Sequence, residues 1–246
     1  MRAANRLARR ILCRLGKEVR PGVTTQELDE LARELTRQAG AKPAFLGYPG
    51  TKGPFPAAIC ASVNEVVIHG IPDGRPLREG DIVGIDYGCI LEGYVGDTAW
   101  TFPVGQVSPE AQHLMEVTRA ALFKGIEQAV EGHRVRDISR AIQRYVESHG
   151  CSVVRAMVGH GVGRTLHEEP QVPNYVGPGF SPRLKAGMTL AIEPMITLGS
   201  YEVRVLDDGW TIVTQDGSLA AHFEHSIAIL PDGPEILSVD PPEGEE

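Results

Sequence analysis

The sequence contains little cysteine, no excess of positive charge and no long hydrophobic run. Its 246 residues include four cysteines, at positions 13, 60, 89 and 151, and no two of them form a CxxC pair. This spacing argues against a cysteine zinc site and favours a reducing, cytoplasmic compartment. The formal net charge is −8, which argues against a DNA-binding surface. No segment approaches the ~18 apolar residues of a membrane span, so no membrane partner is expected.

The length suits one large domain with an ample core. We expect a single domain over residues 1–236, with halves of about 1–105 and 106–236, followed by a disordered acidic tail over 237–246. Five arginines and no acid precede Glu18, a composition also typical of mitochondrial presequences. Because Leu7, Ile11 and Leu15 fall on one helical face, a first helix is the favoured interpretation.

Local signals predict three more helices and several strands. A capping box at 24–27 begins a helix that stops at Gly40, Ser108 caps a helix that runs to Gly132, and a further helix ends at Gly150. Strands are expected over 57–63, 66–68, 153–158, 188–192, 201–206, 210–214 and 223–230. The fold class is therefore α+β.

A hairpin over residues 81–102 carries two acids, Asp86 and Asp97. If Leu91-Glu92-Gly93 makes the turn, the two acids lie directly opposite one another. Carboxylates about 4.5–5.5 Å apart repel and do not both stay ionised unless a cation lies between them. A divalent metal site is one interpretation, and two aspartates at solvated strand edges is the other.

The chain contains two similar patterns of residues. The apolar positions of the helix before Gly40 recur before Gly150 at a constant offset of 110. A basic residue, a glycine, an apolar strand and an acid occur at 78–86 and again at 185–193, which makes Glu193 the counterpart of Asp86. By the same logic Glu224 is the partner of Asp97. Two related halves would then bring four carboxylates to one point.

His160 stands in the glycine-rich segment 158–163, which we expect to be a loop. An imidazole among carboxylates favours Mn, Fe, Co or Zn over calcium. A lone histidine is more often structural than a ligand, so the assignment depends on the acids around it. His167 follows seven residues later, a spacing that differs from HExxH.

Several motifs in order resemble the type I methionine aminopeptidases, which have the pita-bread fold. The motifs lie at residues 20–25, 62–72, 96–99, 159–163, 167–170, 192–194 and 223–225. The resemblance implies two pseudo-two-fold related halves with a curved antiparallel sheet covered by helices. It also implies a monomer that removes the initiator methionine from nascent chains with a small second residue.

The resemblance implies two divalent metal ions per chain, Co, Mn, Fe or Zn. Asp86 would chelate one ion and Asp97 and Glu224 would bridge both. His160 and Glu193 would complete the second, and a bridging hydroxide would attack the first peptide bond. Glu193 would also pass a proton to the leaving amine.

The same resemblance assigns residues to the substrate. His167 would stabilise the developing oxyanion, and His69 would contact the scissile amide, although a turn histidine is the plainer interpretation of His69. An apolar slot for the methionine side chain would be lined by Tyr48, Phe55, Cys60, Leu166 and Trp210. Ordinary core packing is the alternative for these five residues.

Two other functions are compatible with the motifs. One is a proline-specific peptidase of the same fold, and the other is a non-catalytic pita-bread protein that binds partners. All five ligand positions are filled, which disfavours the second. The expected partners are peptide or nascent-chain N-termini. The arginine-rich first helix could also make a transient contact with the ribosome, although a solvated helix face is the more ordinary interpretation.

Overall fold

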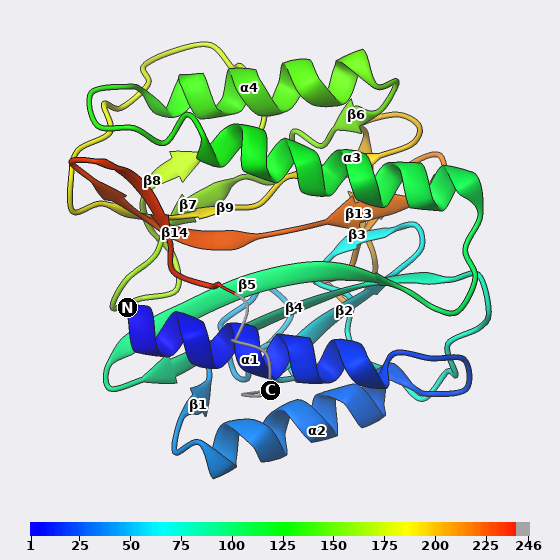
Figure 1. The fold of residues 1–246 in the computed structure, drawn as a ribbon. Coiled ribbons are helices and arrows are strands. Elements are labelled where there is room, and N and C mark those ends of the chain that lie inside the picture. Colours follow the sequence, from blue (N-terminus) through cyan, green and yellow to red (C-terminus); the bar gives the residue numbers. More distant parts are fainter. Residues whose placement is uncertain (240–246) are drawn as a thin grey trace.

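In the part of the chain that the structure describes, four long helices lie in two pairs on either side of the strands. A computed structural model describes residues 1–239. Helices α1 (Arg2–Glu18) and α2 (Thr25–Gln38) cover one side, and α3 (Pro109–Ile126) and α4 (Val135–Ser148) cover the other (Figure 1). Within the described residues, no helix combines the length and apolarity needed to cross a bilayer.

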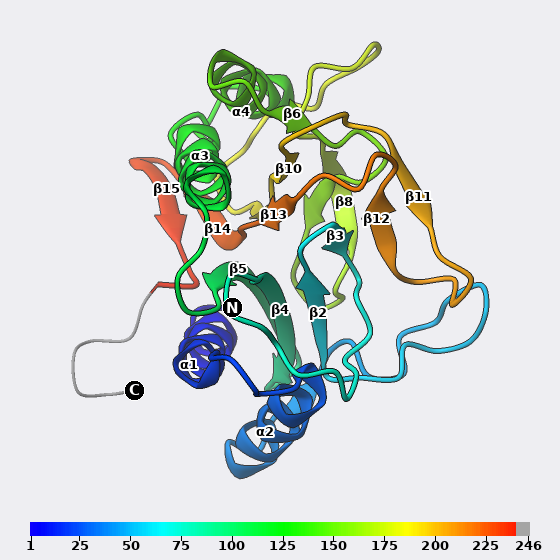
Figure 2. The same cartoon turned by 90° about the vertical axis from the view of Figure 1, so that its right-hand side faces the viewer.

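Over residues 1–239 the strands form four antiparallel sheets. The first joins β1 (Lys42–Pro43), β4 (Ile82–Leu91) and β2 (Ile59–Val63), with β5 (Tyr94–Pro103) paired to β4; the second joins β13 (Ala220–His222), β10 (Met195–Thr197) and β6 (Ser152–Val153). The third joins β11 (Val203–Val205), β12 (Ile212–Thr214) and β3 (Val66–Ile68). The fourth joins β15 (Gly233–Ile236), β14 (His225–Leu230), β9 (Thr189–Ile192), β7 (Gly159–Gly161) and β8 (Glu168–Val172). Figure 2 shows these strands between the two helix pairs. The expected α+β class with helix-covered antiparallel strands is confirmed.

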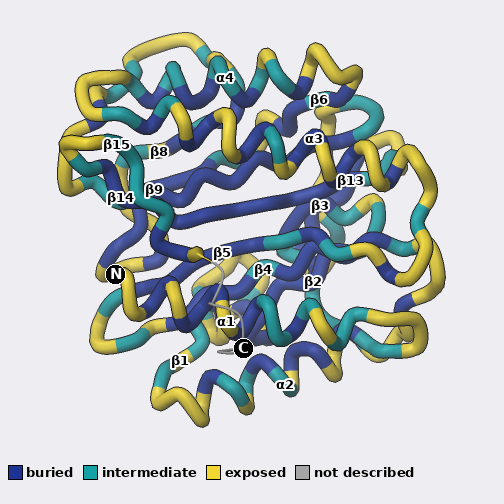
Figure 3. Tube along the Cα trace, in the orientation of Figure 1, coloured by how far each residue is buried: buried dark blue, intermediate teal, exposed yellow. Residues whose placement is uncertain are grey.

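The helices begin where the local signals place them, although α3 ends at Ile126 and not at the expected Gly132. The Thr24 hydroxyl accepts from the backbone of Glu27, whose carboxylate accepts from the backbone of Thr24, as the predicted capping box requires. Ser108 caps α3 with Pro109 at its first position. The apolar face of α1 is buried against β4 and β5, and the buried parts of the chain lie between the helix pairs (Figure 3). This burial of an amphipathic face stabilises each helix more than its intrinsic propensity does.

Matched contacts recur in the two halves at the predicted offsets. In each half the loop before the second helix pairs with the segment before a central strand. The matched hydrogen bonds are Gly22 N–H to Leu77 O at 2.8 Å with Gly132 N–H to Leu184 O at 3.0 Å, and Leu77 N–H to Val23 O with Leu184 N–H to His133 O, both at 2.8 Å. We infer from this pattern that 1–105 and 106–236 are two related halves of a single domain.

The register of the 81–102 hairpin differs from the prediction. Leu91 pairs with Tyr94, so the turn is the two-residue Glu92-Gly93, and both residues have positive φ. This is the geometry of a two-residue type I′ turn, whereas we expected three turn residues. Asp86 therefore faces Ala99 and not Asp97. The shift is of two residues, so both acids still point from the same face of the sheet, on a diagonal.

Several boundaries also differ from the prediction. The segment 159–161, expected as a loop, is strand β7, and of the expected strand 153–158 only Val153 is regular, in β6. Glycine-rich three-residue strands give no alternating pattern to detect. The expected tail began at 237, but Leu237 and Ser238 are buried, so the packed chain continues to that point. The remainder of that expected tail, 240–246, lies outside the described residues.

Gly96 of β5 lies against the backbone of α1 with no room for a side chain. A Cβ at this position would lie 2.3 Å from the Ala4 carbonyl oxygen, so Gly96→Ala should lower the free energy of unfolding by about 1–3 kcal/mol. Urea denaturation of the variant measures this loss. Gly74→Ala is the matched control, because its Cβ would meet only the flexible Gln26 side chain at 3.7 Å. Equal stability of the two variants would contradict this packing.

Candidate metal centre and substrate pocket

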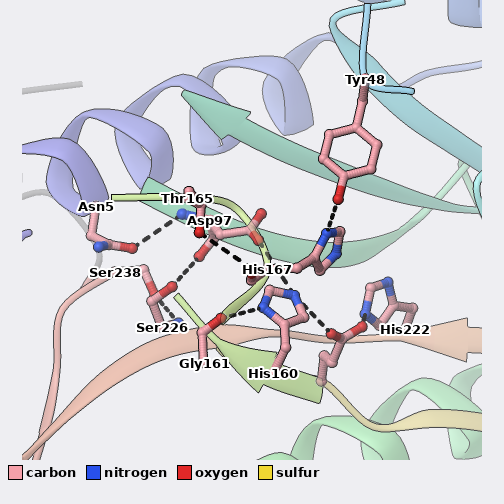
Figure 4. A network of polar contacts seen from close by, with 11 residues as sticks. Asn5, Tyr48, Asp97, His160, Gly161, Thr165, His167, His222, Ser226 and Ser238 are labelled. Atoms are coloured by element: carbon pink, nitrogen blue, oxygen red, sulfur yellow. Dashed lines mark hydrogen bonds and ion pairs between the residues drawn. The ribbon is translucent and has the colours of Figure 1, made fainter. Parts of the chain in front are cut away.

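Asp97 is held by contacts from both halves of the chain. The Asn5 side chain of α1 accepts a hydrogen bond from the Asp97 backbone N–H at 3.2 Å, through its Oδ1. From the second half, Ser226 Oγ donates to the Asp97 carbonyl at 2.9 Å (Figure 4). The side chain of Asp97 is buried, with the residue 3% exposed. The position of this acid therefore depends on how α1 and β14 pack against β5.

Glu193 and Glu224 face one another across a break between two sheets. Ile192 pairs with His225 and Met195 pairs with His222, so Glu193 falls opposite Glu224 if the register is continued across the break. Glu193-Pro194 separates β9 from β10, and Phe223-Glu224 separates β13 from β14. We expected Glu224 inside a strand from 223 to 230, but β14 begins at His225. The two breaks lie side by side.

The two acid pairs meet along β5. The Glu224 N–H donates to the Ala99 carbonyl at 2.9 Å, and Thr98 Oγ1 donates to the Glu224 carbonyl at 3.0 Å. These bonds bind Glu224 to the strand that carries Asp97. Asp97 and Glu224, which are far apart in the sequence, are therefore held close to one another through β5.

His160 presents one ring nitrogen to these acids. Its Nδ1 lies 2.9 Å from the Gly161 carbonyl, which can only accept, so Nδ1 carries the proton in this bond. The free Nε2 lies 3.4 Å from Glu193 Oε1 and 3.9 Å from Asp97 Oδ2. A backbone acceptor on one nitrogen and a free lone pair on the other is the usual arrangement of a metal-binding histidine.

The cluster has the properties of a cation site. Ligand atoms of Asp97, His160 and Glu224 lie within 4.8 Å of one another. One oxygen each of Asp86, Asp97 and Glu224 is buried with no hydrogen-bond partner among the described residues. Buried carboxylate oxygens without partners are costly, and a divalent cation satisfies them. The residues present therefore fit a metal with mixed oxygen and nitrogen ligands.

The acids form the floor of a cavity of about 160 Å³. The cavity is lined by all twelve residues that the sequence indicated for the site: Tyr48, Phe55, Cys60, His69, Asp86, Asp97, His160, Leu166, His167, Glu193, Trp210 and Glu224. Phe55 and Trp210 meet edge to face, with ring centroids 5.2 Å apart. The same cavity is therefore lined by apolar side chains on one part and by the acids and histidines on another.

Comparison with known proteins identifies this arrangement. Residues 1–231 match metallopeptidase family M24. The methionine aminopeptidase of Clostridium perfringens is 53% identical over 239 residues, which cover 97% of this chain and 94% of that protein. The chain belongs to metallopeptidase family M24, among the methionine aminopeptidases. The family expected from the motifs is thus confirmed.

Solved structures agree with the family assignment. The crystal structure of methionine aminopeptidase from Rickettsia prowazekii aligns with a TM-score of 0.93 at 45% identity, covering 97% of this chain and 95% of that one. An Xaa-Pro dipeptidase from Bacillus anthracis aligns with a TM-score of 0.77 at 20% identity, over 98% of this chain and 60% of that one. This second likeness shows only the fold. The M24 chain has the expected pita-bread fold.

The carboxylates of this M24 site differ in their pKa values. Burial raises the pKa of Asp97 to about 7, and burial also raises the pKa of Asp86 and Glu224 well above the usual range, with the neighbouring acids adding to it. Burial alone would raise the pKa of Glu193 too. Polar contact with His222 and the nearness of His160 instead lower it. Glu193 is therefore the acid most readily ionised.

Two histidines expected near the substrate do line the M24 cavity. His69 has a φ of 58°, in the left-handed region that non-glycine residues rarely adopt, and burial lowers its pKa to about 4. Burial also lowers the pKa of His167, whose ring centroid lies 4.4 Å from that of His160. Both rings are therefore neutral near pH 7 and can each donate one hydrogen bond.

Sequence reasoning missed several residues of the site. His222 is buried with its Nε2 3.4 Å from Glu193 Oε2, and Phe45, Ile68, Met157 and Val158 also line the cavity. The position of His222, two residues before Glu224, was a usable signal, because alternate residues of an extended segment share a face. Phe45 lies in a loop, where no periodicity indicates which side chains turn inward.

Metal-free protein should lose stability as the pH rises from about 4 to above 7. A carboxyl whose pKa is raised in the folded state stabilises the fold while it is protonated, and that contribution is lost as pH rises through the folded pKa. Asp97 is such a group, with its pKa raised from 3.8 to about 7. Urea unfolding of chelator-treated protein at about pH 5 and about pH 8 measures the difference.

Two comparisons control this experiment. Asp97→Asn should show a smaller fall in stability, because the amide does not titrate. Added Mn²⁺ should restore the stability of the unsubstituted protein at the higher pH by binding the folded state. Equal stability of the metal-free protein at both pH values would contradict the raised carboxyl pKa values.

Proposed function

We propose that the chain is a methionyl aminopeptidase, a metal-dependent hydrolase that removes the initiator methionine from peptides and nascent chains whose second residue is small. The observation that carries this proposal is the single cavity in which an apolar wall adjoins the acid and histidine cluster. An unbranched apolar side chain would pack against the apolar lining of the cavity. The N-terminal amine of the same peptide would then lie near the acids. The relatives named methionine aminopeptidase support the same substrate.

The proposed cofactor is two divalent ions, Co, Mn, Fe or Zn. Asp86 would hold one, His160 and Glu193 the other, and Asp97 and Glu224 would lie between them. Three buried acids and the half-buried Asp86, once ionised, carry more negative charge than a single divalent ion balances, which supports two. Bound divalent cations would supply charge compensation and a water of lowered pKa.

The protein groups perform the remaining work. The methionine side chain would lie against Tyr48, Phe55, Cys60, Leu166 and Trp210. His167 would donate to the carbonyl oxygen that becomes negative, a contribution typically worth about 3–4 kcal/mol. His69 would contact the amide of the bond to be broken. Glu193, the acid most readily ionised, would accept a proton and pass it to the leaving amine.

The proline-specific alternative has weaker support. Its structural relatives resemble this chain at about one fifth sequence identity, and the chain covers 60% of the Xaa-Pro dipeptidase. The non-catalytic alternative conflicts with the intact set of five ligand residues around one cavity.

The proposed setting is the cytoplasm, with the chain acting as a monomer. Within the described residues none of its four cysteines forms a disulfide, and three of them are buried, which suits a reducing compartment. A transient contact with the ribosome would use the outward face of α1, where Arg6 and Arg10 are exposed. A basic helix face favours a phosphate-rich surface.

Metal-stripped protein should release free methionine from Met-Ala-Ser only after Co²⁺ or Mn²⁺ is added back. An Xaa-Pro peptide assayed beside it should remain uncut, because the apolar wall selects the first side chain. Asp97→Ala is the matched control, and it should stay folded and lose activity with its metal. Cleavage of the Xaa-Pro peptide with Met-Ala-Ser untouched would establish the alternative function instead.

His167→Ala should lower kcat by about 10²–10³-fold while the bound metal content stays the same. The reason is that His167 lines the cavity without being one of the proposed ligands. Metal analysis of the purified variant, beside single-turnover assays, separates the two effects. Loss of metal in His167→Ala would mean that this histidine is a ligand.

A further inference from the structure

Tyr48 makes a contact that its expected place in the methionine pocket does not explain. Its hydroxyl lies 2.6 Å from Nδ1 of His167, and the two rings meet edge to face with centroids 5.2 Å apart (Figure 4). A wall residue for an apolar side chain needs only the ring. The hydroxyl is therefore available for another role.

The hydrogen bond decides which nitrogen of His167 carries the proton. A neutral imidazole has one donor nitrogen and one acceptor nitrogen. When the phenol donates to Nδ1, the ring proton is on Nε2, which faces away from Tyr48. In the opposite arrangement Nε2 would present a lone pair to a cavity that also contains the Glu193 carboxylate, which is electrostatically unfavourable. The phenol is thus the donor.

Both partners of this hydrogen bond are attached to rigid backbone. The Tyr48 carbonyl accepts from Phe55 N–H at 2.9 Å, and the neighbouring Gly47 N–H donates to the Phe55 carbonyl at 2.8 Å. On the other side, the carboxylate of Glu168 accepts from the backbone N–H of Thr165 at 2.9 Å, which closes the turn that bears His167. With both backbones held, the hydrogen bond from the Tyr48 hydroxyl restricts rotation of the His167 imidazole ring.

We infer that Tyr48 is a positioning residue that holds His167 in the Nε2–H tautomer, with that proton available to the substrate carbonyl. This inference rests on the proposed function for the role of His167, but the tautomer itself does not. A carbonyl can only accept, so a bare Nε2 would repel it, and the Nε2–H form would stabilise the charge that develops there. The pocket that recognises methionine thus also sets the donor.

Tyr48→Phe tests this role because it keeps the ring and deletes the hydroxyl. The variant should lose about tenfold in kcat on Met-Ala-Ser with KM roughly unchanged, as expected when an orienting partner is removed. Heteronuclear NMR of the imidazole nitrogens should show His167 as Nε2–H in metal-free wild type and as a tautomer mixture in the variant. The His167→Ala background should abolish the effect of Tyr48→Phe on kcat.

Tyr94→Phe is the matched control. The Tyr94 hydroxyl accepts from Arg164, in the same turn as His167 but away from the cavity, at 3.0 Å. Its removal should change neither kcat nor the tautomer. A rise in KM alone in Tyr48→Phe, or an Nδ1–H tautomer in the wild type, would overturn the inference. Inactive wild type with His167 locked as Nε2–H would refute the proposed function and leave the tautomer assignment intact.

Discussion

The rest of the structure must offset the cost of bringing four carboxyl groups together where water has little access. Asp97 and Glu224 are 3% and 2% exposed, and oxygens of Asp86, Asp97 and Glu224 lack partners among the described residues. Burying such groups costs several kcal/mol each without a counter-charge. The surrounding elements supply the opposing stabilisation: α1 fixes Asp97 through Asn5, and β5 fixes Glu224 through its backbone. The fold thus prepares a site for cations.

The two related halves that we infer would explain how few residues build this site. Asp86 and Asp97 lie on β4 and β5, Glu193 and Glu224 lie in the breaks before β10 and β14, and the Glu224 N–H donates to the Ala99 carbonyl of β5. His160, on the short β7, adds a nitrogen ligand whose tautomer its own neighbour Gly161 sets. The same logic recurs at Tyr48 and His167, where a wall residue sets the tautomer of a substrate-facing ring. Control of protons in this cavity therefore comes from contacts just outside the reacting groups.

Local signals were sufficient for much of this fold and site. The capping box at Thr24 and the helix starts depend on residues a few positions apart, and the repeated pattern pointed to the acids. The substrate-side residues followed from the family resemblance, and all twelve predicted site residues line one cavity. The predicted hairpin register was wrong because the turn has two residues, with Glu92 in the left-handed region, and not the three that we expected. Glu193 lies opposite Glu224 because two strands about thirty residues apart in the sequence pair in one register. The hydrogen bond between Tyr48 and His167 joins residues 119 positions apart. No local pattern encodes these.

The most direct test of the account is to locate metal in crystals of the protein grown with Mn²⁺. Anomalous difference maps should show two peaks, one on each side of the Asp97 and Glu224 carboxylates, with one beside Asp86 and the other beside His160 and Glu193. A map with no peak among these five side chains would contradict the central claim, because the buried acids would then be held together by some other means.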